Sequence, residues 1–64
     1  MRGTVKFFNE QKGFGFILAE DDKEYFVHIS GVEHGTILRD SDNVEFEVVQ
    51  GDKGPKADQV KLDN

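Results

Sequence analysis

The sequence predicts an all-β protein in which one five-stranded antiparallel barrel occupies residues 1–64. Apolar residues occur in runs of about five to eight that are rich in β-branched and aromatic side chains, which is typical of strands. Clusters of Gly, Asp, Asn and Lys separate these runs and mark turns. A chain of this length makes one small domain of marginal stability, with room for one site.

Short turns are expected to join the first three strands into an antiparallel meander. These turns fall at residues 10–12 and 20–23, and a longer polar connection with one helical turn after Ser30 leads to the fourth strand. A loop at residues 51–55 precedes the fifth strand, and Pro55 fits only at the margin of that strand because it lacks a backbone N–H. The predicted strands are residues 3–9, 13–19, 24–28, 43–50 and 56–62.

Side chains alternate between the two faces of a strand, so each strand has a predictable inner side. The fourth strand shows this most clearly, because Val44 and Phe46 alternate with Glu45 and Glu47. The predicted core consists of Val5, Ile17, Val27, Val44, Phe46, Val48 and Val60, with Ile29, Val32 and Leu38.

Three phenylalanines remain outside this core. Phe14 and Phe16 lie opposite the inward side of the second strand, and Phe26 shares a face with His28. Phenylalanine is usually buried, so these rings could pack beneath another element or a second chain. The aliphatic set already fills the interior, however, and no amphipathic segment of helix length is available as a cover. A contiguous exposed apolar patch then indicates a binding partner.

The residues around these rings indicate what the partner is. Lys6 and Lys12 adjoin the rings, and Phe7 lies on the neighbouring strand. Flat rings with scattered cations suit unpaired bases on a phosphate backbone, since stacking contributes about 1–3 kcal/mol per base. We therefore expect single-stranded RNA or DNA to bind with low sequence specificity and without catalysis.

The overall charge argues in the other direction. Thirteen acidic residues against eight basic ones give a net charge of −5, whereas a nucleic-acid-binding domain is expected to carry a basic patch. Screening over about 8 Å at physiological salt makes charge near the site more important than distant acids. The acidic balance nevertheless favours an alternative, a small barrel whose aromatic face binds a peptide or protein.

A metal-dependent hydrolase is a further alternative, because acidic residues cluster at positions 20–24. These residues lack the spacing of a calcium loop, and an acidic turn is usually only solvated. We expect no metal site and no cofactor, and the absence of cysteine rules out disulfides and thiolate chemistry. The longest apolar run is too short to cross a membrane and no signal-peptide pattern opens the chain, so we expect a cytoplasmic monomer.

Four segments of the chain resemble a known family. KGFGFI at residues 12–17 is similar to the first ribonucleoprotein motif of bacterial cold-shock proteins, and YFVHI at residues 25–29 is similar to the second. The similarity extends to GTVKFFN at residues 3–9 and GDKGPKA at residues 51–57, in the same order. This resemblance implies an OB-fold (oligonucleotide-binding) barrel that acts as an RNA chaperone, with effects on transcription or translation.

The resemblance also implies a set of binding residues. His28 is expected to stack and hydrogen-bond rather than to bind metal. Phe8 is left open between core packing and base contact. His34 could partly replace a missing ring, but a solvated loop histidine is the favoured interpretation. The implied nucleic-acid-binding residues are Lys6, Phe7, Lys12, Phe14, Phe16, Phe26, His28 and Lys53, with Phe8 and His34 as additional candidates.

Several positions depart from the family pattern. Phe7 replaces a usual tryptophan, and Ile29 replaces a usual phenylalanine. The connection after Ser30 is shorter than usual and contains no aromatic residue, and Lys53 replaces a common arginine, which loses planar stacking. We therefore expect weaker binding than in a typical member of the family.

Overall fold

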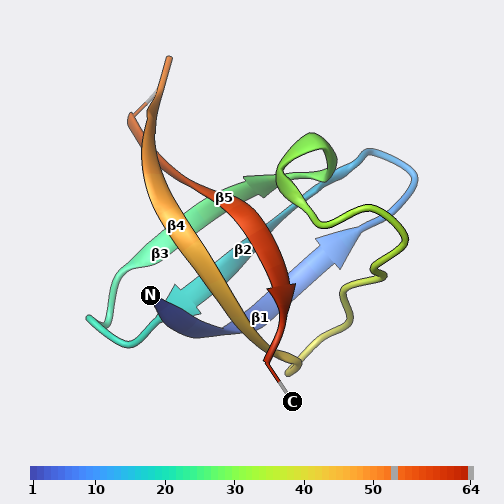
Figure 1. The fold of residues 1–64 in the computed structure, drawn as a ribbon, viewed down its shortest axis with the longest axis horizontal. Helices are drawn as coiled ribbons and strands as arrows, with labels where there is room; N and C mark the ends of the chain where they lie inside the picture. Colours follow the sequence, from blue (N-terminus) through green and yellow to red (C-terminus); the bar gives the residue numbers. More distant parts are fainter. Residues whose placement is uncertain (53, 64) are drawn as a thin grey trace.

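The computed structural model describes residues 1–52 and 54–63 and contains five strands with one short 3-10 helix (Figure 1). The predicted strands are confirmed to within about two residues at each end, and the helical turn near Ser30 is confirmed as η1. None of the helical structure in the described residues is long and apolar enough to span a bilayer. The elements are β1 (Arg2–Asn9), β2 (Phe14–Ala19), β3 (Glu24–His28), η1 (Ile29–Gly31), β4 (Asn43–Gly51) and β5 (Gly54–Leu62).

The strands close into a barrel in the order β1-β2-β3-β5-β4. The predicted five-stranded barrel is confirmed, but the antiparallel expectation fails at one pair. β3 and β5 run parallel, with Phe26 opposite Lys56 and Val27 opposite Ala57. The cause is parity: an odd number of strands in a closed ring cannot alternate direction at every step, so at least one pair must be parallel.

The barrel interior is an apolar core drawn from all five strands and from the connection before β4. Tyr25 packs on Phe46 with ring centroids 5.7 Å apart. Each of the larger buried side chains contributes about 1.5–3 kcal/mol to stability. Most of the predicted core is confirmed, and Val32 packs against it while half-buried. The buried residues are Val5, Ile17, Ala19, Tyr25, Val27, Leu38, Val44, Phe46, Ala57 and Val60.

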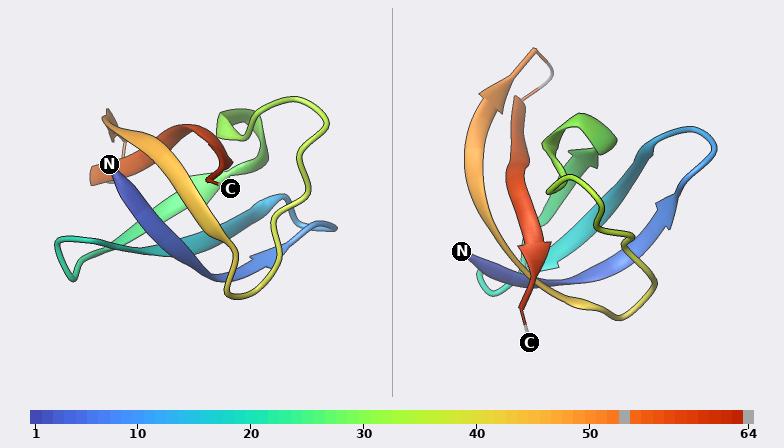
Figure 2. Two further views of the ribbon diagram at one scale, coloured as in Figure 1. Left: turned by 60° about the horizontal axis from the view of Figure 1, so that its bottom comes forward. Right: turned by 45° about the vertical axis from the view of Figure 1, so that its right-hand side comes forward.

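Two residues predicted to be in the core, Val48 and Ile29, are exposed. Val48 lies opposite the buried Ala57, but it sits toward the β4–β5 hairpin, which extends past the other strands (Figure 2). Alternation along a strand gives the face of a side chain and not its depth in the barrel. Ile29 begins η1, where the strand periodicity ends, so its predicted inward position is wrong.

A β-bulge decides how the two adjacent phenylalanines of β1 are oriented. Val5 lies opposite Ile17, whereas Phe7 lies opposite Phe16, so the register shifts by one residue at Lys6. A bulge leaves one extra residue unpaired and reverses the alternation that follows it. Phe7 is therefore exposed on the outer face, and Phe8 is half-buried and packs against the core.

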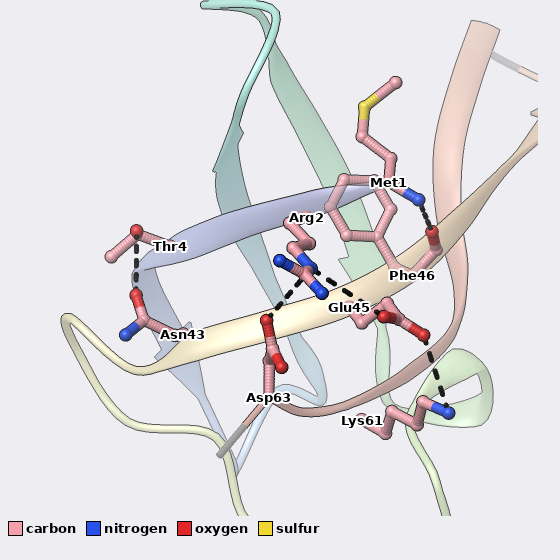
Figure 3. Close-up of polar contacts among 8 residues, drawn as sticks. All are labelled: Met1, Arg2, Thr4, Asn43, Glu45, Phe46, Lys61 and Asp63. Carbon is pink, nitrogen blue, oxygen red and sulfur yellow. Dashed lines mark hydrogen bonds and ion pairs between the residues drawn. The ribbon is translucent and has the colours of Figure 1, made fainter.

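Ion pairs hold the closing seam of the barrel, where β1 meets β4 and the end of β5 (Figure 3). The Arg2 Nε atom lies 3.3 Å from an oxygen of Asp63 and 3.9 Å from an oxygen of Glu45. Lys61 Nζ lies 3.5 Å from the other oxygen of Glu45. These two basic residues are thus paired with carboxylates at the seam and do not belong to the face that carries the phenylalanines.

Candidate nucleic-acid interface

Four phenylalanines form one continuous cluster on the outer face of β1, β2 and β3. Phe7, Phe16 and Phe26 lie opposite one another in register, with centroid distances of 5.6 Å and 5.8 Å between successive rings. Phe14 lies 5.9 Å from Phe26 at an interplanar angle of 23°. These separations are typical of favourable aromatic pairs. We call these four residues the aromatic platform.

The four rings of the platform are partly buried by their neighbours and partly open to solvent. Phe7 and Phe26 are 39% and 36% exposed as whole residues, and Phe14 and Phe16 are half-buried. None of the four belongs to the core cluster, so the prediction that Phe14, Phe16 and Phe26 lie outside the core is confirmed. The rings are therefore fixed by their neighbours and still present surface to a ligand.

Gly15 explains how the platform strands come so close together. A Cβ atom at this position would lie 2.2 Å from the carbonyl oxygen of Phe7 and 2.7 Å from the Cα of Phe8. Both contacts are with backbone atoms of β1, which cannot move aside without breaking the β1–β2 pairing. Glycine is thus required for β1 and β2 to pack at the bulge that turns Phe7 outward.

His28 extends the platform beside Phe14, which lies opposite it in register. The His28 Nδ1 atom accepts a hydrogen bond of 3.1 Å from the backbone N–H of Ser30 and lies 2.9 Å from the Ser30 hydroxyl oxygen. Because a backbone N–H can only donate, the neutral ring carries its proton on Nε2. His28 thereby caps η1 and can present both a flat ring and an N–H donor to a ligand.

Lys12 lies in the turn that joins β1 to β2, at the Phe14 end of the platform. Its backbone N–H donates to the Asn9 side-chain oxygen at 3.0 Å, and Gly13 N–H donates to the Asn9 carbonyl at 2.7 Å. Gly13 has a φ of +75°, a conformation that glycine adopts without strain. The turn is therefore ordered by its backbone, and the Lys12 side chain is exposed.

Lys6 is exposed on the bulge of β1, but it is paired with an acid. Its Nζ atom lies 3.2 Å from both carboxylate oxygens of Glu24 on β3. Lys53, the other predicted cation, lies outside the described residues. The fold thus places Lys6 on the bulge of β1 and Lys12 in the turn before Phe14, and it pairs Lys6 with Glu24, a contact that the sequence does not predict.

Two residues near the platform are not among those predicted from the sequence. Lys56 lies opposite Phe26, so it continues the row of Phe7, Phe16 and Phe26 onto β5. Leu18 is 47% exposed on the platform side of β2. Alternation with Phe14 and Phe16 could have identified Leu18, whereas Lys56 could not be placed without knowing that β3 pairs with β5.

The remaining candidates lie at the edges. Ile29, where the family usually has a ring, is exposed next to Gly13 and extends the surface with aliphatic atoms. His34 is exposed in a turn closed by the hydrogen bond from Thr36 N–H to the Glu33 carbonyl, so the structure places it in a solvated loop. Phe8 packs inward as described above.

The acidic turn between β2 and β3 has a structural explanation. The Tyr25 hydroxyl donates a 2.8 Å hydrogen bond to Asp21, and the Lys23 N–H donates to the other Asp21 oxygen at 3.1 Å. The Tyr25 bond lowers the pKa of Asp21 and raises the pKa of Tyr25. Within residues 1–52 and 54–63, no three acidic or histidine side chains are grouped to hold a metal ion.

Other acidic residues lie on a different side of the barrel. A pocket of about 560 Å³ opens between η1, β4 and β5 and includes none of the platform phenylalanines. Its lining includes four carboxylates, those of Glu33, Glu45, Glu47 and Asp58. Four of the thirteen acidic side chains thus line a pocket that is separate from the platform.

A small closed five-stranded barrel that exposes a row of phenylalanines across three strands, with lysines at its margins, has the architecture of an OB-fold. A family model described as the 'Cold-shock' DNA-binding domain matches residues 1–62, and the chain belongs to this family. The description of this family is that of a nucleic-acid-binding domain. The resemblance found in the sequence is thereby confirmed.

Similar proteins carry the same family name. Cold shock protein CspA of Staphylococcus saprophyticus and that of Staphylococcus epidermidis are each 51% identical to the chain over 61 residues. Cold shock protein CspA of Staphylococcus aureus is 49% identical over 61 residues. In each case the match covers 92% of this chain and 92% of the relative, so the similarity extends over nearly the whole length of both.

Proposed function

We propose that the aromatic platform binds single-stranded RNA or DNA by stacking successive bases on its rings. The observation that carries this proposal is the in-register row of Phe7, Phe16 and Phe26, which is half-open to solvent and continuous with Phe14. Lys6, Lys12 and Lys56 lie at its margins, where they can meet phosphates. Lys53 remains a predicted contact from the resemblance alone.

The expected affinity follows from this geometry. Three or four stacked bases contribute about 1–3 kcal/mol each, against an association cost of about 4–15 kcal/mol. Short oligonucleotides therefore bind modestly, and longer strands bind better. Because every base has a flat face, sequence preference is weak. Duplexes bind poorly, since their bases are already stacked on one another.

The cellular role that fits such binding is that of an RNA chaperone. A protein that stacks unpaired bases competes with base pairing, so it keeps transcripts single-stranded and influences their transcription or translation. We propose that residues 1–64 act as one domain, as a cytoplasmic monomer without cofactor or catalytic activity. Family membership and the open platform support this role.

Titration with a short oligouridine, followed by NMR of the phenylalanine rings, tests the proposal. The rings of Phe7, Phe14, Phe16 and Phe26 should shift with added strand. The ring of Phe46 lies in the core and serves as an internal control. An oligouridine that leaves the four platform rings unperturbed would overturn the proposal.

A second candidate is a peptide-binding barrel that uses the same face. The exposed aliphatic surface of Leu18 and Ile29 at either end of the platform and the net charge of −5 favour it. Under this alternative a basic apolar peptide shifts the platform rings and oligouridine does not. The same titration, run with both ligands, separates the two functions.

A further inference from the structure

The Lys6–Glu24 ion pair spans the outer face of β2. Lys6 is on β1 and Glu24 is on β3, and β2 lies between these strands in the barrel. In the register Glu24 lies opposite Leu18, and Lys6 precedes the residue opposite Phe16. The pair therefore crosses β2 between the levels of Phe16 and Leu18, at the edge of the aromatic platform.

We propose that Glu24 competes with the phosphate backbone for Lys6 and thereby limits the affinity of the platform. The inference rests on the proposed single-strand binding and adds a residue that weakens it. With Glu24 in place, Lys6 is engaged with both oxygens of a carboxylate, and a phosphate must displace that carboxylate to reach Lys6.

Displacement is energetically accessible. The Lys6 and Glu24 side chains are 57% and 48% exposed, so the pair is hydrated and weak. A phosphate that takes over Lys6 also approaches the freed carboxylate of Glu24, which repels it. The binding free energy gained when a phosphate displaces Glu24 is therefore smaller than the gain at an unpaired lysine. This difference in binding free energy is the cost that Glu24 imposes.

The other described lysines near the platform differ from Lys6 in this respect. Among residues 1–52 and 54–63, carboxylates within 4.0 Å of a lysine nitrogen are found at Lys6 and at Lys61, and Lys61 is at the closing seam. Lys12 and Lys56 have no such partner within the described part of the chain. Glu24 thus acts on one cation of the site, and its effect is separable from that of the overall acidity.

A double-mutant cycle tests the inference, using Glu24→Gln, Lys6→Gln and the pair of substitutions together. Glu24→Gln should bind a labelled oligouridine about two- to fivefold more tightly at low salt, as expected for release of an exposed ion pair. The slope of log affinity against log salt should become steeper by up to about 0.7, the value for one additional phosphate contact. In the Lys6→Gln background, the gain should disappear.

Glu47→Gln is the matched control, because it removes the same charge from an exposed position on β4. Its affinity should change by less than about 1.5-fold, since screening weakens distant charges. Melting temperatures close to that of the unsubstituted protein establish that the variants are folded, and Glu24→Ala provides a second replacement should the glutamine variant fail to fold.

The outcomes separate this inference from the function on which it rests. No binding by the unsubstituted protein contradicts the proposed function itself. Binding with shifted platform rings, combined with an unchanged or weaker affinity for Glu24→Gln, contradicts only the role of Glu24. An equal gain with and without Lys6 also contradicts it, because the effect would then be a through-space charge effect and not competition for Lys6.

Discussion

Replacing Phe16 separates the stacking role of the platform from a structural one. Phe16 lies in the middle of the row, 5.6 Å from the Phe7 ring and 5.8 Å from the Phe26 ring, and its side chain is half-buried. In Phe16→Leu most of the apolar volume stays, whereas the flat face is lost. Phe16→Ala removes both.

The expected magnitudes differ for binding and for stability. Loss of one stacking ring should weaken oligouridine binding by about 1–3 kcal/mol, or roughly 5- to 150-fold, in both variants. Phe16→Leu should lower the free energy of unfolding by about 1–2 kcal/mol, mainly through two lost aromatic pairs. Phe46→Ala, in the core, should cost about 3–5 kcal/mol.

Fluorescence anisotropy with a labelled oligouridine gives the affinity, and chemical denaturation gives the free energy of unfolding. Both are measured on the same preparations, so that loss of fold is not mistaken for loss of binding. If the affinity of Phe16→Leu is within about twofold of that of the unsubstituted protein, the loss of binding free energy is well below the expected value of about 1–3 kcal/mol. That result would refute the stacking argument.

Three further predictions concern charge, backbone packing and pH. Because few lysines meet phosphates, the slope of log affinity against log salt should be shallow, about two to three, and a much steeper slope would show that other cations reach the strand. Gly15→Ala should unfold the barrel or lower its melting temperature sharply, whereas Gly35→Ala, with open space around its Cβ but a φ of +85°, should cost only about 1–2 kcal/mol; equal losses would contradict the proposed backbone clash. The unsubstituted protein should have a higher free energy of unfolding than Tyr25→Phe, and this stability advantage should be full near neutral pH. It should be lost in acid, as pH falls through the lowered pKa of Asp21, and in alkali, as pH rises through the raised pKa of Tyr25; an advantage that does not change with pH in denaturation experiments would contradict the linkage.

The features that depend on local alternation could be predicted from the sequence. The strands, the inward set around Val44 and Phe46, and the outward rings on β2 and β3 all follow from a period of two. The same alternation also places Leu18 on the outward face of β2, although Leu18 is not among the predicted site residues. Local periodicity therefore predicted most of the fold and three of the four platform rings.

Features that depend on register could not be predicted in this way. The one-residue shift in register at Lys6 turns Phe7 outward and Phe8 inward. The local sequence does not predict this shift. The parallel pairing of β3 with β5 places Lys56 beside Phe26, although the two residues are far apart in the sequence. The Lys6–Glu24 pair likewise joins strands that are not neighbours in the barrel.

The positions of the charged residues answer part of the objection that the net charge raises against nucleic-acid binding. Arg2 and Lys61 are paired at the closing seam, and four of the thirteen acidic residues line the pocket between η1, β4 and β5. The basic residues at the platform are a small number of lysines, and one of them, Lys6, forms an ion pair with Glu24. Stacking rather than charge is thus expected to dominate the affinity.

The most direct test of the stacking claim is to detect base protons against the platform rings in the bound state. In an NMR study of the protein saturated with a short oligouridine, intermolecular NOEs should connect uracil base protons to the ring protons of Phe7, Phe16 and Phe26. Base-proton NOEs confined to other parts of the surface, with none to these three rings, would contradict the account.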